Sequence, residues 1–505
     1  MQLKLKNGLK KPNPMSVETL DKPAPAARRL THRETMWIVA GVLLPVFMAS
    51  FDQSMVATTL PTIGREFGST GQLSWVVTAY LLTSTAATPL YGKISDTRGR
   101  RSTMLVGIII FIVGAAASAL APNMTMLILA RGLQGIGGAG LVAQAMTVLG
   151  DIAPPKERAK YYTYFSIIYT TAGGVGPVVG GYFAQHLHWS LVFWVSVPMG
   201  IVSFALTSSL LRKLPRYEKY HRLDVIAALL IVAASSTLML VMNTGGKTWP
   251  WLSAEILSFS AASAILWMLF FLRLLQAPEP LIPLGILRNP IVRCAIVANS
   301  FGWSAVIGLN IYLPLYLQTV MGKTPSESGL HLMVLMVTVN ASALIGAQVA
   351  ARMEHYKLYP MVTLVLCIAC ISWLAVRVDS ISMLEFELVL ALAGIGFGPV
   401  APVSSVALQN AVVMHQLGTA ISVMSFARSL FAAVLVAALG AVVLHAVGGE
   451  VMGGAASTLA ADKDAATAAF RTLFWMTAGC FVIAFLGLLL MEERPLLTSN
   501  DARMG

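Results

Sequence analysis

The sequence predicts an all-α polytopic membrane protein with fourteen transmembrane helices. Of its 505 residues, 56% are apolar and only 11% are charged, whereas a soluble domain carries about 25% charged residues. Runs of about 20 mostly apolar residues, the length that one helix needs to cross a bilayer, recur along the chain. Positive charge is concentrated in alternate loops between these runs. The composition therefore excludes a soluble, disordered or disulfide-stapled protein.

Short polar loops separate the fourteen apolar runs. The runs cover residues 36–60, 72–91, 102–121, 124–149, 161–185, 189–211, 223–243, 252–272, 291–317, 327–350, 359–378, 384–408, 419–445 and 469–491. Residues 1–35 are polar, basic and proline-containing, and they lack the apolar stretch of a cleavable signal peptide. We expect this segment to be a disordered cytoplasmic tail and residues 492–505 to be a second cytoplasmic tail.

The distribution of lysine and arginine orients the predicted spans. With the N-terminus in the cytoplasm, 27 of the 35 basic residues fall on the cytoplasmic side, 6 fall outside, and Arg131 and Arg428 fall within spans. The positive-inside rule predicts this asymmetry, and an odd number of spans would scramble it. The net charge of +12 therefore indicates membrane orientation rather than a nucleic-acid partner. We expect a multi-pass protein of the cell (inner) membrane with both termini cytoplasmic.

A weak internal repeat divides the chain. Gly135-Ile136-Gly137 in the fourth run is matched by Gly394-Ile395-Gly396 in the twelfth, and the basic loop beginning at Gly92 by a shorter one near Gly346. Aligning these segments predicts two six-helix halves around an inserted two-helix hairpin with its preceding basic loop: 36–211, 273–491 and 212–272. Two such halves suggest alternating access, in which the halves rock around a site near the membrane midplane.

The first run contains a lone acidic residue. Asp52 is the only one of the 23 acidic residues that lies well inside a predicted span. A carboxylate there costs on the order of several kcal/mol, so it normally faces a cavity or a partner and marks a transport pathway. Desolvation favours its protonated form, which makes Asp52 a candidate proton carrier. The alternative is a permanently paired structural acid.

The loop between the second and third runs has an ordered set of charges. It reads Gly92-Lys-Ile-Ser-Asp96-Thr-Arg-Gly99-Arg100-Arg101. Gly99 can supply a positive φ for the chain reversal. Asp96 is one carboxylate among four cations, placed to form a charge network or to meet a helix N-terminus. A loop that only sets membrane orientation would need no such order.

Two later runs are rich in glycine. In the fourth, Arg131 and Gln134 precede Gly135 and Gly138, and glycines at this spacing let a neighbouring backbone approach closely. The fifth contains a second glycine set with one proline, which predicts a kinked helix with a flat face that serves as a hinge or as packing. That set is Gly173, Gly176, Pro177, Gly180 and Gly181.

Other reactive side chains do not form a recognisable site. The four cysteines lie in apolar stretches with no second pair or nearby histidine for zinc, so we expect them to be packing residues. The sequence has no catalytic triad in a plausible aqueous pocket and no nucleotide-binding Gly-x4-Gly-Lys-Ser/Thr run. It therefore predicts no enzyme, no metal and no cofactor. Weaker candidates for a substrate cavity are His331, Tyr162, Tyr164, Tyr169, Phe301 and Trp303.

In order and position, the four motif segments resemble the signature motifs of the major facilitator superfamily, above all its fourteen-helix drug:proton antiporter branch of multidrug efflux proteins. The first-span motif has Ser54 where threonine is usual, and the second-half loop has Ala350 at the counterpart of Asp96. The glycine–proline segment of the fifth run is similar to the motif that separates exporters from many importers.

The resemblance implies a secondary transporter that exports lipophilic or cationic drug-like small molecules in exchange for protons. It implies proton coupling or substrate binding at Asp52, Arg131 and Gln134. It also implies a cytoplasmic gate at Gly92, Asp96, Gly99, Arg100 and Arg101. Expected partners are the substrate, protons and the lipid bilayer, with a periplasmic adaptor as a further candidate and a monomer as the expected state. The alternatives are a proton-coupled nutrient importer and a non-transporting membrane sensor.

Helix geometry also predicts a contact between the two charges of the first half. Asp52 lies about nine residues from the outer end of its span, and Arg131 lies about seven residues from the outer end of the fourth span, which runs in the opposite direction. At about 1.5 Å per residue, both lie roughly 10–14 Å below the outer surface. Because an unpaired charge at this depth is costly, we expect the two to pair, directly or through water or Gln134.

Overall fold

The computed structural model describes residues 32–68, 72–153, 155–213, 224–246, 249–278, 280–323, 325–353, 355–447 and 463–495. In these ranges the chain is almost entirely helical, apart from one isolated bridge between Gly245 and Trp249. The helices are α1 (His32–Phe67), α2 (Leu73–Arg98), α3 (Arg100–Ala119), α4 (Met124–Gly138), α5 (Leu141–Ile152), α6 (Pro155–His186), α7 (Leu191–Leu210), α8 (Val225–Thr244), α9 (Ala254–Gln276), α10 (Leu284–Arg288), α11 (Pro290–Thr319), α12 (Pro325–Arg352), α13 (Leu358–Val376), α14 (Met383–Phe397), α15 (Val400–Ala411), α16 (Leu417–Val447) and α17 (Lys463–Leu490).

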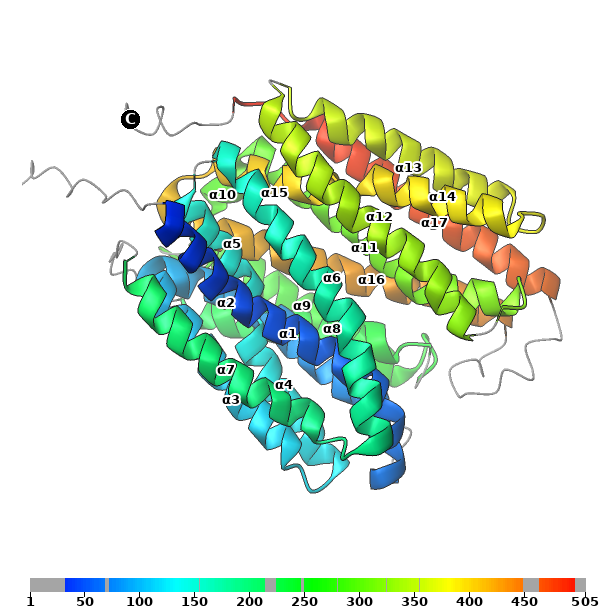
Figure 1. Ribbon diagram of the computed structural model, residues 1–505, viewed down its shortest axis with the longest axis horizontal. Coiled ribbons are helices and arrows are strands. Elements are labelled where there is room, and N and C mark those ends of the chain that lie inside the picture. Colours follow the sequence, from blue (N-terminus) through cyan, green and yellow to red (C-terminus); the bar gives the residue numbers. More distant parts are fainter. Residues whose placement is uncertain are drawn as a thin grey trace, which may run out of the picture.

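The long helices run beside one another in two groups (Figure 1). In the first group α1 packs against α6 and α7, and α3 packs against α4 and α7. In the second, α11 packs against α16 and α17, and α13 packs against α14 and α17. The groups meet where α2 lies against α16 and where α6 lies against α12. Helix α1 begins and α17 ends at the same end of the bundle (Figure 1).

Two of the predicted spans are broken near their middle. The predicted span 124–149 forms α4 and α5 with a turn at Ala139–Gly140, and the span 384–408 forms α14 and α15 with a turn at Gly398–Pro399. The proline lacks the N–H that would continue the helix through the second turn. Each break follows the Gly-Ile-Gly segment of its span, Gly135–Gly137 in one and Gly394–Gly396 in the other.

Twelve helical segments of the described residues are long and apolar enough to cross a membrane. They include α8 and α9, which pack along each other. Predicted spans 72–91 and 161–185 are also helical, as α2 and α6, but these two helices lie outside that set because they are more polar. The described part of the chain is thus almost all helical, with the helix lengths and composition of a multi-pass membrane protein.

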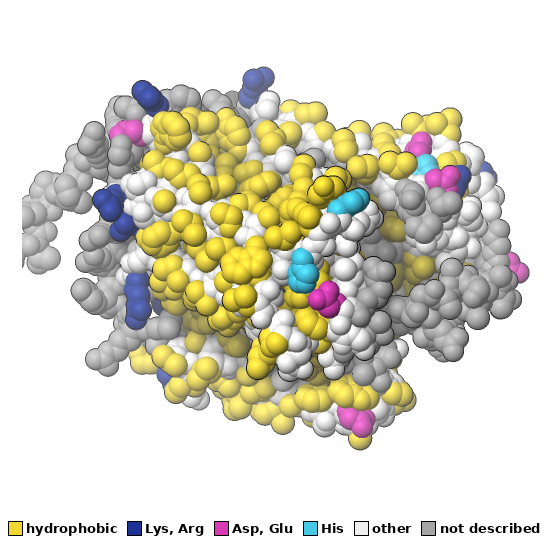
Figure 2. All heavy atoms as spheres, turned by 60° about the horizontal axis from the view of Figure 1, so that its bottom comes forward, with side chains coloured by type: hydrophobic (Ala, Val, Ile, Leu, Met, Phe, Trp, Pro, Cys, Tyr) yellow, Lys and Arg dark blue, Asp and Glu magenta, His cyan; other side chains and the backbone are white. Residues whose placement is uncertain are grey.

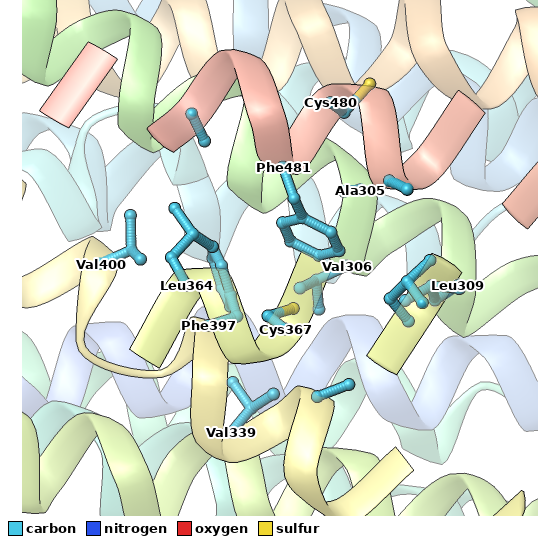
Figure 3. Packing of buried hydrophobic residues seen from close by; sticks show 14 of the residues in the cluster. Ala305, Val306, Leu309, Val339, Leu364, Cys367, Phe397, Val400, Cys480 and Phe481 are labelled. Atoms are coloured by element: carbon cyan, nitrogen blue, oxygen red, sulfur yellow. The ribbon is translucent and has the colours of Figure 1, made fainter. Parts of the chain in front are cut away.

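A large apolar core fills the second half. Figure 3 shows Phe397 of α14 and Phe481 of α17 facing each other, with Cys367 of α13 beside them. The two phenyl rings lie 5.8 Å apart. All four cysteines are free thiols, and Cys367 is fully buried among these side chains. The prediction that the cysteines serve as packing residues agrees with these positions.

The outer surface is apolar in its middle and basic at one end. Figure 2 shows a broad hydrophobic belt, with most of the visible lysine and arginine side chains gathered toward one end. Many of the exposed residues are leucine, isoleucine or valine, which is the surface that a lipid-facing bundle requires. We call the end that carries the loop between α2 and α3 the basic end.

Candidate functional site

Asp52 of α1 lies at the centre of a buried polar cluster. Nη1 of Arg131 donates to Oδ2 of Asp52 at 2.7 Å, and Nε2 of Gln134 donates to Oδ1 at 2.9 Å. The hydroxyl of Ser196 on α7 also donates to Oδ1, at 3.2 Å. All four side chains are at most 1% exposed. Helices α4 and α7 of the first half therefore supply three donors to the one carboxylate on α1.

Arg131 makes further hydrogen bonds and contacts two aromatic rings. Its Nη1 also donates to Oε1 of Gln134 at 2.7 Å, and its Nε donates to the carbonyl of Val76 on α2 at 3.4 Å. Its guanidinium carbon lies 4.5 Å from the ring centroid of Tyr80 and 5.6 Å from that of Phe193. Cations over aromatic faces are stabilised by the negative face of the ring. The cluster therefore has the partners that allow a buried charge pair to persist.

The predicted contact between Asp52 and Arg131 is confirmed, and it is direct. Gln134 bonds to both partners instead of bridging a gap between them. Sequence reasoning missed Ser196, Tyr80 and Phe193, because serine and aromatic residues are common in apolar spans and only packing shows which of them face a charge.

The glycines of α4 let α2 come close to this cluster. A Cβ at Gly135 would lie 2.5 Å from the carbonyl oxygen of Tyr80, and one at Gly138 would overlap the Tyr80 hydroxyl. Polar contacts continue toward the basic end, where Thr83 Oγ1 donates to the Gly132 carbonyl at 2.8 Å and Thr88 Oγ1 to the Ala139 carbonyl at 2.9 Å. Hydrogen bonds thus join α2 to α4 and to the turn that follows α4 at two levels.

At the basic end, Asp96 links the two halves. Its Oδ1 accepts from the backbone N–H of Gly418 at 3.0 Å, and its Oδ2 accepts from the N–H of Thr419 at 2.7 Å and from the Thr419 hydroxyl at 2.6 Å. These donors form the N-terminus of α16, where the helix dipole favours negative charge. Both predicted roles of Asp96, in a charge network and at a helix N-terminus, are observed together.

Arg100 joins that carboxylate to a second one. Its Nη1 contacts Oδ1 of Asp96, and its Nε donates to Oδ2 of Asp151 at 2.8 Å. All three side chains are below 10% exposed. Gly92 stands at the same junction, because a Cβ there would lie 2.7 Å from the carbonyl oxygen of Gly418. Asp151 was not singled out from sequence, since it follows the fourth span in an ordinary basic loop.

The remaining loop residues act inside the first half. Gly99 has φ 92°, as predicted, and ends α2 one residue before α3 begins. The guanidinium Nε of Arg101 donates to the carbonyl of Ser208 on α7 at 2.9 Å. We expected Arg101 to hold the gate, but its observed bond ties α3 to α7 and does not cross to the second half.

The glycines of α6 fall into two sets. A Cβ at Gly176 would overlap the Ser54 hydroxyl, and one at Gly180 would lie 2.6 Å from the Met55 carbonyl oxygen. Gly173 and Gly181 have nothing within 4 Å of an added Cβ. Ser54 adds a bond of 2.7 Å to the Ala172 carbonyl. Gly176 and Gly180 therefore lie where α6 packs closely on α1. Helix α6 continues without a break through Pro177.

The weaker cavity candidates lie in different surroundings. Nδ1 of His331 lies 2.7 Å from Oε1 of Glu387 on α14, a partner that sequence reasoning did not consider. Tyr164 and Tyr169 are exposed, and Phe301 and Trp303 contact residues of α16. The side chain of Tyr162 lies outside the described residues.

The chain is a multi-pass membrane protein built from two helical halves. Residues 42–437 match the Major Facilitator Superfamily. Because the match spans most of the chain, the protein belongs to this superfamily, whose members are transporters rather than enzymes.

The chain is similar to named relatives and to solved structures over most of its length. The chain is 31% identical to the multidrug transporter protein MdtP of Bacillus subtilis over 405 residues, which cover 80% of this chain and 74% of the relative. It is 29% identical to multidrug resistance protein 3 of the same organism, over 78% of this chain and 77% of the relative. Among solved structures, the human organic anion transporter MFSD10 matches with a TM-score of 0.64 at 14% identity, covering 90% and 99% of the two chains. A bacterial homologue of the iron transporter ferroportin in an outward-facing state matches with a TM-score of 0.67 at 12% identity, covering 92% and 100%. These two likenesses show the fold alone.

Proposed function

We propose that the protein is a proton-driven exporter of lipophilic, drug-like small molecules that works by alternating access. The buried Asp52 cluster is the observation that carries this proposal. Asp52 is an acid within the membrane whose charge is balanced by Arg131 and by two further hydrogen bonds, from Gln134 and Ser196. Protonation of this carboxylate would remove its charge and leave Arg131 without an anion. The first half would then lose the stabilisation that the buried ion pair provides.

The energy of one proton is sufficient for useful export. A membrane potential of 100 mV supplies about 2.3 kcal/mol per elementary charge. A tenfold concentration ratio requires about 1.4 kcal/mol. Inward movement of one proton could therefore sustain a substrate gradient on the order of 10- to 100-fold.

In the proposed mechanism the Asp96 network closes one side of the transporter. Its bonds to Gly418 and Thr419 connect the halves at the basic end, which we assign to the cytoplasm from the positive-inside rule. Rocking must break these bonds before the basic end opens. Gly92, Asp96 and Arg100 form the junction, while Gly99 and Arg101 shape the first half beside it.

We also propose that fourteen helical segments cross the bilayer, with both termini cytoplasmic in a cell (inner) membrane. Helices α2 and α6 have 26 and 32 residues. At about 1.5 Å per residue each exceeds the hydrocarbon thickness of about 30 Å. Threonines of α2 bond to carbonyls of α4 and its following turn, so part of its polarity is satisfied inside the protein. The α8–α9 hairpin then lies between halves 36–211 and 273–491.

The names of the relatives favour export over the alternative, a proton-coupled importer of a nutrient. MdtP and multidrug resistance protein 3 are both named for drug transport or resistance. We expect a monomer, and we do not extend the proposal to a periplasmic adaptor, which the comparisons do not support.

A flux assay in proteoliposomes tests the proposal. The purified protein is reconstituted, a pH gradient is imposed, and uptake of a panel of lipophilic compounds is followed together with the internal pH. We expect accumulation driven by an acidic interior, with protons and substrate moving in opposite directions and a protonophore abolishing the uptake. Movement of protons and substrate in the same direction would identify an importer, and the absence of flux for every compound would favour a sensor.

A further inference from the structure

The α8–α9 hairpin packs over the line where the two halves meet. Helix α8 contacts α2 of the first half and α16 of the second half, and these two helices also pack against each other. The hairpin takes no part in the Asp52 cluster or in the Asp96 network. Any movement that separates α2 from α16 must nevertheless pull at least one of them away from α8.

An apolar cluster joins the hairpin to both halves. Ile231 of α8 and Phe270 of α9 are at most 2% exposed, and they belong to this cluster together with Phe426 of α16. Leu90 of α2 packs against the same cluster. The ring of Trp267 on α9 lies 6.3 Å from the ring of Phe426. Within a bilayer such packing stabilises through van der Waals contact, and this stabilisation is lost when the surfaces separate.

Polar contacts fix the hairpin at the basic end. Nε of Arg273 on α9 donates to Oδ2 of Asp224 at 3.0 Å and to its Oδ1 at 3.2 Å. Asp224 also caps α8, because its Oδ1 accepts from the N–H of Ala227 at 3.1 Å. In the linker after α9, the carbonyl of Pro280 accepts from Nζ of Lys93 on α2 at 3.4 Å. Asp224 therefore joins the two arms of the hairpin, and Lys93 ties its linker to the first half.

These contacts lie beside the Asp96 network. Lys93 precedes Asp96 on α2 by about one helical turn, and Phe426 follows Thr419 on α16 by about two turns. Alternating access has to part α2 from α16 at this end, and a hairpin that packs on both helices cannot follow both. Contacts that are made only in the closed state shift the equilibrium toward that state.

We propose that the α8–α9 hairpin is a clamp that stabilises the state closed at the basic end. Asp224 and Arg273 are positioning residues, which keep the two arms aligned against α2 and α16. The inference rests on the alternating access of the proposed function and adds a second closing device beside the Asp96 network. A hairpin that only fills the membrane beside the transporter would affect thermal stability when it is altered, but not the ratio of open to closed protein.

Spin-label distances across the basic end test the clamp. Labels are attached to Arg98→Cys at the end of α2 and His415→Cys just before α16, two positions that are exposed. The four native cysteines are replaced by alanine in every protein compared, and the full-length protein is measured in lipid nanodiscs without substrate or a pH gradient. We expect Ile231→Ala to raise the ratio of open to closed protein by about fivefold or more, since it removes packed side-chain atoms. Arg273→Gln should raise it roughly two- to fivefold, the range for a partly exposed ion pair, and Arg273→Lys should raise it less.

Ile226→Ala is the matched control, because it makes the same substitution in the same helix at a side chain that is 56% exposed. It should leave the distances unchanged. Unaltered distances in folded Ile231→Ala and Arg273→Gln proteins would overturn the clamp even if their melting temperatures fall, and so would an equal shift in Ile226→Ala. Because the assay contains no substrate and no proton gradient, a failure of proton-driven flux leaves its result intact. Normal proton-driven flux with unaltered distances in both hairpin variants would overturn the clamp alone.

Discussion

Asp96 and Thr419 belong to opposite halves, and both the backbone N–H and the hydroxyl of Thr419 donate to the same carboxylate oxygen of Asp96, at 2.7 and 2.6 Å. Charge-assisted hydrogen bonds are worth roughly 1.5–3 kcal/mol each. This contact connects the two halves that the proposed alternating access must separate.

Asp96→Asn should loosen the basic end without unfolding the protein. An amide lacks the charge that Arg100 and the α16 N-terminus stabilise, so we expect the closed state to lose roughly 2 kcal/mol, a shift of about 30-fold. Transport should slow for several substrates, while substrate affinity changes by less than about threefold. Spin-label distances between α2 and α16 would report the opening directly.

Arg98→Gln is the matched control for that loop, since Arg98 is exposed. It should transport at the wild-type rate. A wild-type rate for Asp96→Asn as well would show that the loop serves only membrane orientation.

Gly176→Ala should disrupt the packing of α1 on α6. The added methyl group would overlap the Ser54 side chain, and overpacking of this kind costs about 1–3 kcal/mol. We expect a lower melting temperature and slower transport, with recovery when Ser54→Gly is added. Gly173→Ala has free space and should melt at or above the wild-type temperature. Equal melting temperatures for the two single variants would refute the proposed contact.

The fourteen-span topology predicts the side from which single cysteines react. Arg212 and Leu252 are exposed and flank α8 on opposite sides. Cysteine at 212 should react with a membrane-impermeant maleimide only from the cytoplasm, and cysteine at 252 only from outside. Reaction of both from one side would remove α8 as a membrane crossing.

Sequence reasoning located the helices and the charge pair well, because both depend on regular spacing. The depth of Asp52 and Arg131 follows from the helical rise alone, and the apolar runs show where helices form. The sequence did not show which glycine of α6 contacts α1, Gly176 or Gly173, because that contact depends on how each helix is rotated about its own axis. The contacts of the basic loop in the second half were likewise not predictable from the sequence.

In that loop, Lys357 Nζ donates to the carbonyls of Leu489 and Met491, at 2.7 and 2.6 Å. Its backbone N–H donates to Glu493 at 3.0 Å. The loop of the second half is therefore tied to the C-terminal end of α17 in its own half, whereas Asp96 bonds across to the other half. These partners are more than 130 residues apart, so no local pattern could have joined them. Arg428 and Trp303 were separately visible in the sequence, but only tertiary packing shows that they meet.

The Asp52–Arg131 pair should behave as one unit. Asp52→Asn and Arg131→Ala each remove a partner of the same buried bond, so the losses of the two single variants should not add in the double variant. Rates of proton-driven transport for the four proteins give the coupling energy. Fully additive losses would show that the two residues act independently.

In the proposed mechanism Asp52 couples proton movement to export, and the Asp52→Asn protein provides the sharpest test. In proteoliposomes with an acidic interior, we expect this variant no longer to concentrate a substrate but still to equilibrate it down its own gradient. Asp379→Asn, which changes an exposed acid, should accumulate substrate as wild type does. An Asp52→Asn protein that still concentrates substrate against a gradient would show that Asp52 does not couple proton movement to export.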